Sequence, residues 1–319
     1  MDSHQQETMS ILRTKARKML SQFQYTWQVQ KGNLKSLGLA KTVQLNAILL
    51  DAWMRDRLNR KSYRVLDENQ LHLTRKSEKV FIFGCGYSLN DISPEEWQHI
   101  SQHDTLGFNH FTYQNWIPVD YHLMRGGVYE CFDNWQGFAI DYMKTLNENP
   151  YFKDTILILQ GEYRAQFCNQ LIGYKLVRPG TQIFRYTTAR TSKLPTHSFQ
   201  EGLSHNSGTL CDVVNFAYCL GWKEIVLVGV DLYDTRYFWL QPEETLAVDY
   251  STGKIVAGKT NNVRGQRYDE THNTARNGIV EIMAEWRDVF QENGVEMSVY
   301  NPRSLLKEVM PVYRSPALI

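Results

Sequence analysis

The sequence lacks the patterns that mark several large classes of protein. Its five cysteines form no Cys-x-x-Cys pair, and their odd number argues against a disulfide framework. No stretch approaches the roughly 18 apolar residues of a membrane-spanning helix, and the first residues lack the basic-then-apolar order of a signal peptide. These absences predict a protein of a reducing compartment, cytoplasmic and at most peripherally attached to the inner membrane.

Common catalytic signatures are missing as well. The chain has no Gly-x-Ser-x-Gly turn of a serine hydrolase. It also has no Asp-x-Asp pair and no cluster of cysteines. Because closely spaced carboxylates and thiolates are frequent ligands of divalent metals, we expect no resident metal ion and no other cofactor.

Charge is spread unevenly along the 319 residues, although the formal net charge is only +1. Residues 1–80 hold 15 lysines and arginines against 7 acidic residues, which gives 15 − 7 = +8 and leaves 1 − 8 = −7 for the remainder. This asymmetry favours an anionic partner for the first segment. An anionic membrane surface is one candidate partner. Nucleic acid is a second anionic partner, which we do not favour. The alternative is a basic face that is exposed to solvent and binds no partner.

Two amphipathic helices are predicted in the basic segment. Apolar residues recur at intervals of three and four over residues 10–30 and again over 42–60, which is the spacing of one helical face. A helical hairpin packed on the main domain or on a second subunit of a homo-oligomer is the simplest interpretation. A role at a membrane surface would need an exposed Trp27 or Trp53. We expect this helical extension to cover residues 1–77.

A buried parallel sheet is predicted for the rest of the chain. The six consecutive apolar or glycine positions Ile225–Val230 lie between charged residues, as in a strand that is covered on both faces. Apolar residues at helical spacing precede it over Ser207–Leu220, and Gly221 supplies the helix stop. The pattern predicts an α/β domain over residues 78–319 with a doubly wound, mostly parallel, Rossmann-like sheet.

Further elements follow from the same patterns. Strands are predicted over residues 80–83, 105–108, 120–124, 155–159, 182–186 and 295–300, and helices over 129–148 and 273–293. Another helix is expected to open at Ser93-Pro94-Glu95-Glu96, because serine caps helices, proline suits the first helical position and acids suit the first turn. A last helix is predicted to open at Asn301-Pro302. Residues 234–271 are polar and rich in aromatics with weak strand or helix signals, and we expect them to form a lid.

Polar residues at the ends of the predicted strands converge on one edge of such a sheet. They are Ser88, Asn109, Arg125, Ser207, Asp231, Tyr233, Tyr237 and His272. The loop Gly84–Leu89 lies between a strand and the capped helix, so it could present backbone N–H groups to a nucleotide phosphate or be a plain turn. His272 could take a proton near neutral pH or serve only as a polar helix cap. The set suggests group transfer from a nucleotide-activated donor.

Several blocks of the sequence resemble the bacterial sialyltransferases that transfer sialic acid from CMP-sialic acid to cell-surface lipooligosaccharides. The family's blocks are GNGPSL, CNQF, TSG with GYKEI and GIDFY, HSKNT, and CPNSLL. The similar blocks here, in the same order, are Phe83–Leu89, Phe108–Phe111, Asn206–Tyr233, His272–Thr274 and Asn301–Leu306. The match runs from about residue 78 to 313, is poor between 125 and 200, and leaves the first 77 residues uncovered.

The resemblance implies roles for these residues. Tyr233 and Tyr237 would hydrogen-bond the departing CMP phosphate, and His272 would be the general base. Donor contacts would come from Gly84, Cys85, Gly86, Ser88, Asn109, Arg125, Ser207, Gly208 and Asp231. The implied activity is an inverting, metal-independent transfer of a sugar from a CMP-activated donor to a hydroxyl of a cell-surface glycan or glycolipid.

The sequence departs from the family pattern at two positions, because Cys85 replaces an asparagine and Tyr87 a proline. The transferred sugar could therefore be sialic acid or a related keto-sugar. The motility-associated flagellin glycosyltransferases and the Mg²⁺-dependent hydroxymethylpterin pyrophosphokinase-like proteins share part of these motifs. Either of these activities, or a non-catalytic nucleotide-binding scaffold, is the alternative.

Overall fold

The computed structural model describes residues 3–126, 135–189, 192–233, 235–239, 245–249, 254–258 and 271–316. The chain divides into two compact units, residues 1–51 and residues 52–319. The division falls earlier than the boundary at residue 77 expected from the sequence. No helix in the described ranges is both long and apolar enough to cross a membrane.

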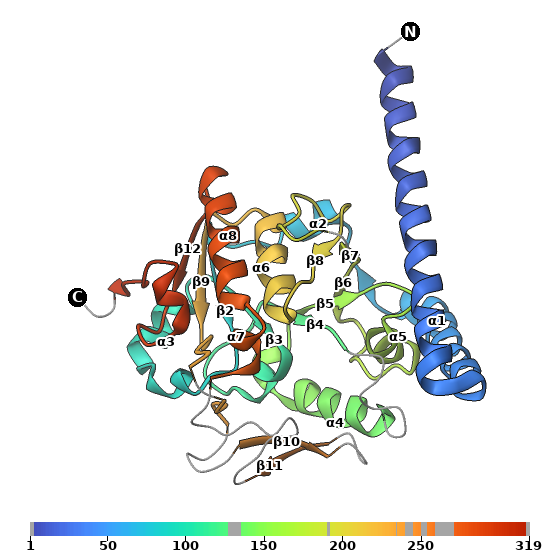
Figure 1. The fold of residues 1–319 in the computed structure, drawn as a ribbon. Helices are drawn as coiled ribbons and strands as arrows, with labels where there is room; N and C mark the ends of the chain where they lie inside the picture. Colours follow the sequence, from blue (N-terminus) through green and yellow to red (C-terminus); the bar gives the residue numbers. More distant parts are fainter. Residues whose placement is uncertain are drawn as a thin grey trace. The chain divides into compact units, whose positions relative to one another are not determined.

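The first unit is helical and is broken at a single glycine. Helix α1 (Ser3–Asn59) is interrupted at Gly38, whose φ of 76° and ψ of 172° are not helical. The side-chain amides of Gln30 and Asn46 exchange two hydrogen bonds of 2.6 and 3.1 Å across this break. A pair 16 residues apart can meet only if the chain reverses direction between them. The two predicted helices are thus confirmed, and they form a hairpin around Gly38 (Figure 1).

The second unit is built on an eight-stranded sheet in which every paired strand is parallel, as predicted (Figure 1). The strands are β1 (Arg64–Val65), β2 (Lys79–Phe83), β3 (Asp104–Phe108), β4 (Tyr121–Met124), β5 (Ile156–Gln160), β6 (Gln182–Tyr186), β9 (Glu224–Val228) and β12 (Glu296–Val299). Their order is β1-β6-β5-β4-β3-β2-β9-β12. The chain therefore runs outward from β2 through β3 to β6 and then returns to add β9 on the other side of β2.

Helices cover both faces of this sheet, and strands such as β2 contribute alternate side chains to two separate cores. Val80 and Ile82 of β2 lie in a core closed by α2 (Glu68–His72), α6 (Thr209–Leu220) and α8 (Ile279–Glu292). Phe81 and Phe83 lie in the opposite core, which is closed by α3 (Pro94–Ile100), α4 (Trp135–Glu148) and α5 (Gln166–Gly173). Burial on both faces explains why these strands are continuous apolar runs.

Two predicted helix ends are confirmed by their capping geometry. Ser93 and Glu96 form a reciprocal capping box at the start of α3. Gly221, which follows α6, has a φ of 87° and accepts the left-handed conformation that ends the helix.

Three other predictions need correction or fall partly outside the described residues. The single helix expected over residues 273–293 is two helices, α7 (Asn273–Arg276) and α8, because Gly278 between them is left-handed with a φ of 82°. The helix expected at Asn301-Pro302 is only a 3₁₀ turn at Leu305–Glu308, because Asn301 accepts the Arg303 N–H and forms a turn of its own. Of the helix expected over 129–148, residues before Trp135 lie outside the described part.

The remaining short strands lie outside the main sheet. β7 (Thr188–Ala189) pairs in parallel with β8 (Leu203–Ser204). β10 (Thr245–Asp249) and β11 (Lys254–Gly258) pair antiparallel. This hairpin falls within the segment expected to form a lid, most of whose other residues are outside the described part. The lid itself stays a prediction.

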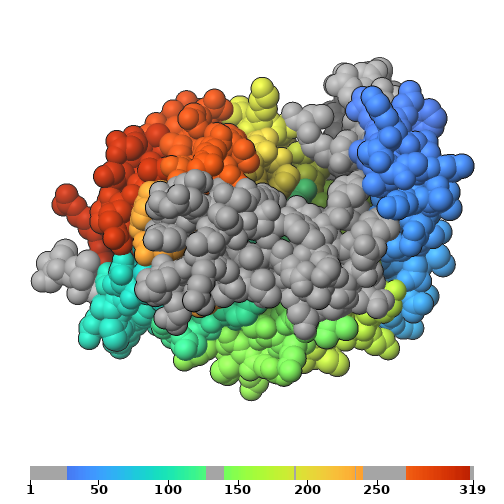
Figure 2. All heavy atoms as spheres, turned by 60° about the horizontal axis from the view of Figure 1, so that its bottom comes forward, coloured from blue at the N-terminus to red at the C-terminus, as the bar shows by residue number. Residues whose placement is uncertain are grey.

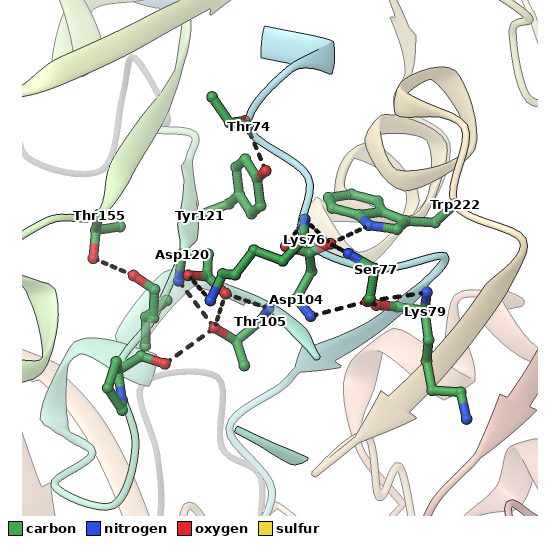
Figure 3. A network of polar contacts seen from close by, with 12 residues as sticks. Thr74, Lys76, Ser77, Lys79, Asp104, Thr105, Asp120, Tyr121, Thr155 and Trp222 are labelled. Carbon is green, nitrogen blue, oxygen red and sulfur yellow. Dashed lines mark hydrogen bonds and ion pairs between the residues drawn. The ribbon is translucent and has the colours of Figure 1, made fainter. Parts of the chain in front are cut away.

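A polar network fixes the amino edge of the sheet (Figure 3). Asp104, the first residue of β3, is wholly buried. Its carboxylate accepts hydrogen bonds from the backbone N–H groups of Lys76 and Ser77 and, at 2.8 Å, from the indole of Trp222. One side chain thus joins the segments that lead into β2, β3 and β9, three neighbouring strands of the sheet.

Candidate active site at the carboxyl edge of the sheet

The candidate site lies where the chain changes direction across the sheet, between β2 and β9. Ligands of open α/β sheets bind outside the carboxyl ends of the strands at such a switch point. Here the two ends are the loop Gly84–Ser88 after β2 and the segment Gly229–Tyr233 after β9. Figure 2 turns this edge toward the viewer, with the C-terminal elements in orange and red bordering the face on one side.

Asp231 is the centre of the polar contacts at this edge. It is 3% exposed. Its Oδ2 accepts the Ser88 N–H at 2.9 Å, and its Oδ1 accepts the Ser88 hydroxyl at 2.5 Å and the Asn301 amide at 2.8 Å. The neighbouring Ser304 hydroxyl donates to the Val230 carbonyl at 2.6 Å. The carboxylate therefore holds three segments of the site together, and its oxygens are engaged within the protein.

The glycines of the first loop are required by close backbone approach. The N–H groups of Gly84 and Gly86 donate to the carbonyls of Val228 and Gly229 at 2.8 and 2.7 Å. A Cβ at Gly86 would lie 2.4 Å from the Asp231 Oδ2 and 2.7 Å from the Gly229 carbonyl oxygen. The glycine signal in the sequence thus marks the contact of β2 with β9. Any phosphate contact by this loop would need N–H groups other than those of Gly84, Gly86 and Ser88.

Tyr237 and His272 meet beside this loop. Tyr237 forms an isolated β-bridge with Gly86, and its hydroxyl lies 3.3 Å from the His272 Nε2. The His272 backbone N–H donates to the Leu232 carbonyl at 3.0 Å, which ties the histidine to the end of β9. Two predicted catalytic residues are therefore in direct contact, although 35 residues separate them.

The His272 ring has a defined hydrogen-bond pattern. Its Nδ1 accepts the Thr274 N–H at 3.1 Å and so caps α7. Because Nδ1 accepts, the proton of the neutral ring lies on Nε2, which then donates to the Tyr237 hydroxyl. The polar-cap interpretation of His272 is confirmed by this geometry. A base role for the ring would require the bond to Thr274 to open first, since Nε2 already carries a proton.

Two residues at the ends of strands have backbone conformations that are rare for side-chain-bearing residues. Leu232, after β9, has a φ of 65°, and Asn109, after β3, has a φ of 52°. Asparagine tolerates this region, whereas a left-handed leucine costs about 1–2 kcal/mol. Such strain gathers at functional sites. Leu232 turns the chain so that its carbonyl receives His272.

The other predicted residues near the switch point have different surroundings. The Arg303 guanidinium lies 5.8 Å from the centre of the Tyr233 ring. The Cys85 thiol lies 3.8 Å from the Phe108 carbonyl, and burial raises its pKa to about 12. A thiol with such a pKa stays protonated at neutral pH and is a poor nucleophile. Asn109 is exposed, and its carbonyl accepts the Tyr142 hydroxyl at 2.6 Å.

Aromatic rings gather next to the Tyr237 side chain. Trp239 stacks on Tyr237 with ring centres 4.9 Å apart and also lies 5.0 Å from Tyr113 and 5.8 Å from His110. Burial lowers the pKa of His110 to about 4, so its ring is neutral at physiological pH. Such a group of rings offers an apolar surface on which a flat heterocycle could stack.

The remaining predicted residues belong to a second polar group around the amino end of α6. Arg125, directly after β4, donates to the carboxylate of Asp212 at 2.7 Å and to the Thr188 hydroxyl at 3.2 Å. Ser207 donates to the Asn277 carbonyl at 3.0 Å. Gly208, with a φ of 134°, is the residue before α6.

The structure thus places Tyr237 and His272 with the Asp231 cluster, and Arg125 with Asp212. The predicted site residues did not include the partners that complete these groups, namely Asn301, Ser304, His205 and Asp212, although the first two lie in the Asn301–Leu306 block. No spacing in the sequence links Asn301 to Asp231, 70 residues away, and only the shared edge of the sheet could suggest it. The sequence also contains a His-x-x-x-His spacing, at His99 and His103.

That histidine pair lies in a packed cluster rather than around an open site. Both rings pack against Phe81, and the His99 Nε2 lies 3.0 Å from the Tyr313 hydroxyl. Burial is the largest of the effects that lower the pKa of each histidine. Within the described ranges, no three His, Cys, Asp or Glu side chains are grouped so that they could hold a metal ion.

Comparisons with known proteins identify no family. No protein-family model matches the chain, and no curated protein matches it. Among solved structures, the MAf glycosyltransferase from Magnetospirillum magneticum AMB-1 is similar with 15% identity and a TM-score of 0.39. The alignment covers 76% of this chain and 34% of that one, so this chain spans about a third of that protein's length.

Proposed function

We propose that this protein is a glycosyltransferase that moves sialic acid or a related keto-sugar from a CMP-activated donor to a hydroxyl of a glycan or glycolipid. The observation that carries the proposal is the contact of Tyr237 with His272 beside the Asp231 cluster, at the switch point of the sheet. The motif resemblance connects Tyr237 with the departing CMP phosphate and His272 with the role of general base. The reaction is proposed to proceed with inversion and without a metal ion.

The Tyr237–His272 pair suits a leaving phosphate. The Nε2–H of His272 donates to the Tyr237 oxygen, so the phenolic proton is directed to another acceptor. A phosphate oxygen on which charge develops would be such an acceptor, and a hydrogen bond to a charged group is stronger than one to a neutral group. Tyr233, next to Leu232 whose carbonyl holds His272, is proposed to contribute a second phenol.

The base of the nucleotide is proposed to stack on the aromatic group formed by Trp239, Tyr113 and His110. Tyr113 and His110 belong to the 3₁₀ turn Asn109–Tyr113 that directly follows β3, and the Trp239 ring lies near both. The basic segment, residues 1–77, is proposed to hold the enzyme at an anionic membrane surface where glycolipid acceptors reside. Co-sedimentation with anionic but not neutral vesicles would support that location, and no difference between the two vesicles would refute it.

Nucleotide binding is the first test of the proposed function. A thermal-shift panel of CMP, CDP, UDP, GDP and ATP, each with and without EDTA, reports binding to the folded protein. We expect CMP to raise the melting temperature most, with no effect of EDTA. Stabilisation by ATP that requires Mg²⁺ would indicate a pyrophosphokinase-like activity instead. No stabilisation by any nucleotide would refute the proposal.

Turnover is the second test. CMP release from CMP-sialic acid and from related CMP-linked keto-sugars is followed chromatographically, with galactosides as acceptors. Tyr237→Phe should lower turnover on the order of 10²-fold, the effect of removing one donor to developing charge. Tyr218→Phe is the matched control, because it also removes one phenol but lies against Phe290 on α8. Equal turnover in wild type and Tyr237→Phe would remove the assigned role, and binding of CMP without turnover would favour a non-catalytic scaffold.

A further inference from the structure

A second histidine at the carboxyl edge is held by a buried carboxylate. The Nδ1 of His205 lies 2.5 Å from the Oδ2 of Asp212, while Arg125 donates to the Oδ1 of the same carboxylate at 2.7 Å. Asp212 is wholly buried, whereas 31% of the His205 side chain is exposed. The carboxylate is thus fixed on both oxygens, and the histidine projects from it toward the surface.

Other polar groups complete this cluster. Thr188 of β7 accepts from Arg125 at 3.2 Å and from Gln160, the last residue of β5, at 3.0 Å. Asp212 lies in the first turn of α6, where a negative charge is favourable. Side chains from the ends of β4, β5 and β8 and from β7 and α6 therefore converge at one place.

The hydrogen-bond pattern of His205 is the opposite of that of His272. The ionised Asp212 carboxylate can only accept, so the His205 Nδ1 carries the proton and donates it. The lone pair of the neutral His205 ring is then on Nε2, the nitrogen that points away from Asp212. In His272 the lone pair is on Nδ1 and is used by the Thr274 N–H. Of these two rings, His205 is the one whose outward nitrogen can accept a proton.

His205 lies at the same edge as the Tyr237–His272 pair. Its loop continues into Ser207, whose hydroxyl donates to the Asn277 carbonyl at the end of α7, and α7 begins directly after His272. Helix α6, which starts from this loop, packs on β2, the strand that bears the glycine loop. The bond from Ser207 to Asn277 places the amino end of α6 beside the end of α7 (Figure 1).

We propose that His205, oriented by Asp212, is the side chain that takes the proton from the acceptor hydroxyl. This inference rests on the proposed glycosyl transfer. The acceptor oxygen forms a bond to the anomeric carbon as the bond from that carbon to the phosphate oxygen of CMP breaks, and the electron pair of the broken bond stays on the phosphate. The hydroxyl proton moves to the His205 Nε2. Asp212 stays ionised and stabilises the imidazolium, so it is a positioning residue.

The tautomers of the two histidines can be measured independently of activity. Long-range ¹H–¹⁵N correlation spectra of the ¹⁵N-histidine-labelled full chain at pH 8 report which ring nitrogen carries the proton, and His205→Gln and His272→Gln assign the signals. We expect a protonated Nδ1 in His205 and a protonated Nε2 in His272. A protonated Nε2 in His205 would overturn the proposal, whatever the activity.

Kinetics tests the proton transfer itself. His205→Ala should lower turnover on the order of 10²-fold or more while CMP affinity stays within about twofold, as for a group that acts in proton transfer. Added imidazole should restore part of the activity of His205→Ala, which a merely structural role would not allow. Asp212→Asn should lower turnover without rescue by imidazole. His197→Gln is the control, because His197 is an exposed histidine whose Nδ1 lies 3.0 Å from the hydroxyl of Tyr218 on α6.

The role of His205 and the glycosyltransferase function would be refuted by different results. Turnover in His205→Ala equal to that of wild type, or a loss that imidazole does not restore, would overturn the role of His205 and leave the glycosyltransferase proposal intact. A wild-type chain that neither binds CMP nor releases it from any CMP-sugar would refute the glycosyltransferase proposal and the inference with it.

Discussion

The substitution Asp231→Asn should destabilise the protein strongly, because Asp231 joins three segments of the site. Its two oxygens receive the Ser88 N–H, the Ser88 hydroxyl and the Asn301 amide in a place that is almost closed to solvent. Asparagine has the same shape but only one acceptor oxygen. Its NH₂ group must face at least one of the three donors, whichever way the amide is turned.

The expected magnitude follows from these contacts. A hydrogen bond to a charged group contributes about 1.5–3 kcal/mol, and a buried donor left without an acceptor costs about 1–3 kcal/mol. Because the Ser88 hydroxyl can rotate and recover part of the loss, we expect the free energy of unfolding to fall by about 2–4 kcal/mol. Urea unfolding followed by circular dichroism measures this change.

A matched control separates burial from the loss of a charge. Asp288→Asn removes a carboxylate whose side chain is 61% exposed and which pairs with the adjacent Arg287. Surface ion pairs contribute about 0–1 kcal/mol, so this variant should remain close to wild type. If Asp231→Asn and Asp288→Asn unfold at the same urea concentration, Asp231 does not join the segments as described. The double variant with Ser88→Ala should also be less destabilised than the sum of the two single changes.

Three further expectations test other parts of the molecule. Burial lowers the pKa of His122 to about 3 from 6.5, so the unfolded chain binds the extra proton first as the pH falls, and the stability from this group is complete above pH 6.5 and is lost toward pH 3. His122→Gln should therefore reduce the fall in unfolding free energy between pH 7 and pH 5 by about 2 kcal/mol. An unchanged fall would contradict a neutral His122 ring in the folded protein. Asp104→Ala leaves two backbone N–H groups and the Trp222 indole without their acceptor, so unfolding free energy should fall by about 3–5 kcal/mol, and urea midpoints equal to wild type would speak against the network. With a pKa of about 12, the Cys85 thiol should resist iodoacetamide at pH 8 in the native protein and react after unfolding. Peptide mass spectrometry measures both, and rapid labelling of the native protein would contradict the raised pKa.

The sheet was predictable because its strands are buried on both faces. A strand such as β5, with Ile156 to Leu159 closed to solvent, is a continuous apolar run that differs from the surrounding polar loops. Helix ends were predictable where one residue decides them, as at Ser93 and Gly221. Gly278 has the same left-handed geometry, yet the apolar spacing continues across it, and the sequence therefore indicated one helix where there are two.

The site was less predictable because its contacts join distant segments. The glycines of the Gly84–Ser88 loop were found from their spacing. They are required because β9 approaches β2 closely, and this follows from a strand order that no local pattern contains. His272 and Tyr237 were selected by their places in the motifs, and the structure adds that they touch. Asp212 lies inside the Asn206–Tyr233 block and His205 directly before it, but no spacing marks the two as partners, and the start of α6 brings their side chains together.

The most direct measurement of the central claim is the position of CMP in a crystal of the full chain grown with millimolar CMP. We expect the nucleotide to lie outside the carboxyl ends of β2 and β9, with its phosphate within hydrogen-bond reach of the Tyr237 hydroxyl. CMP bound at any other edge of the sheet, with the Tyr237–His272 contact remote from it, would contradict the proposed site.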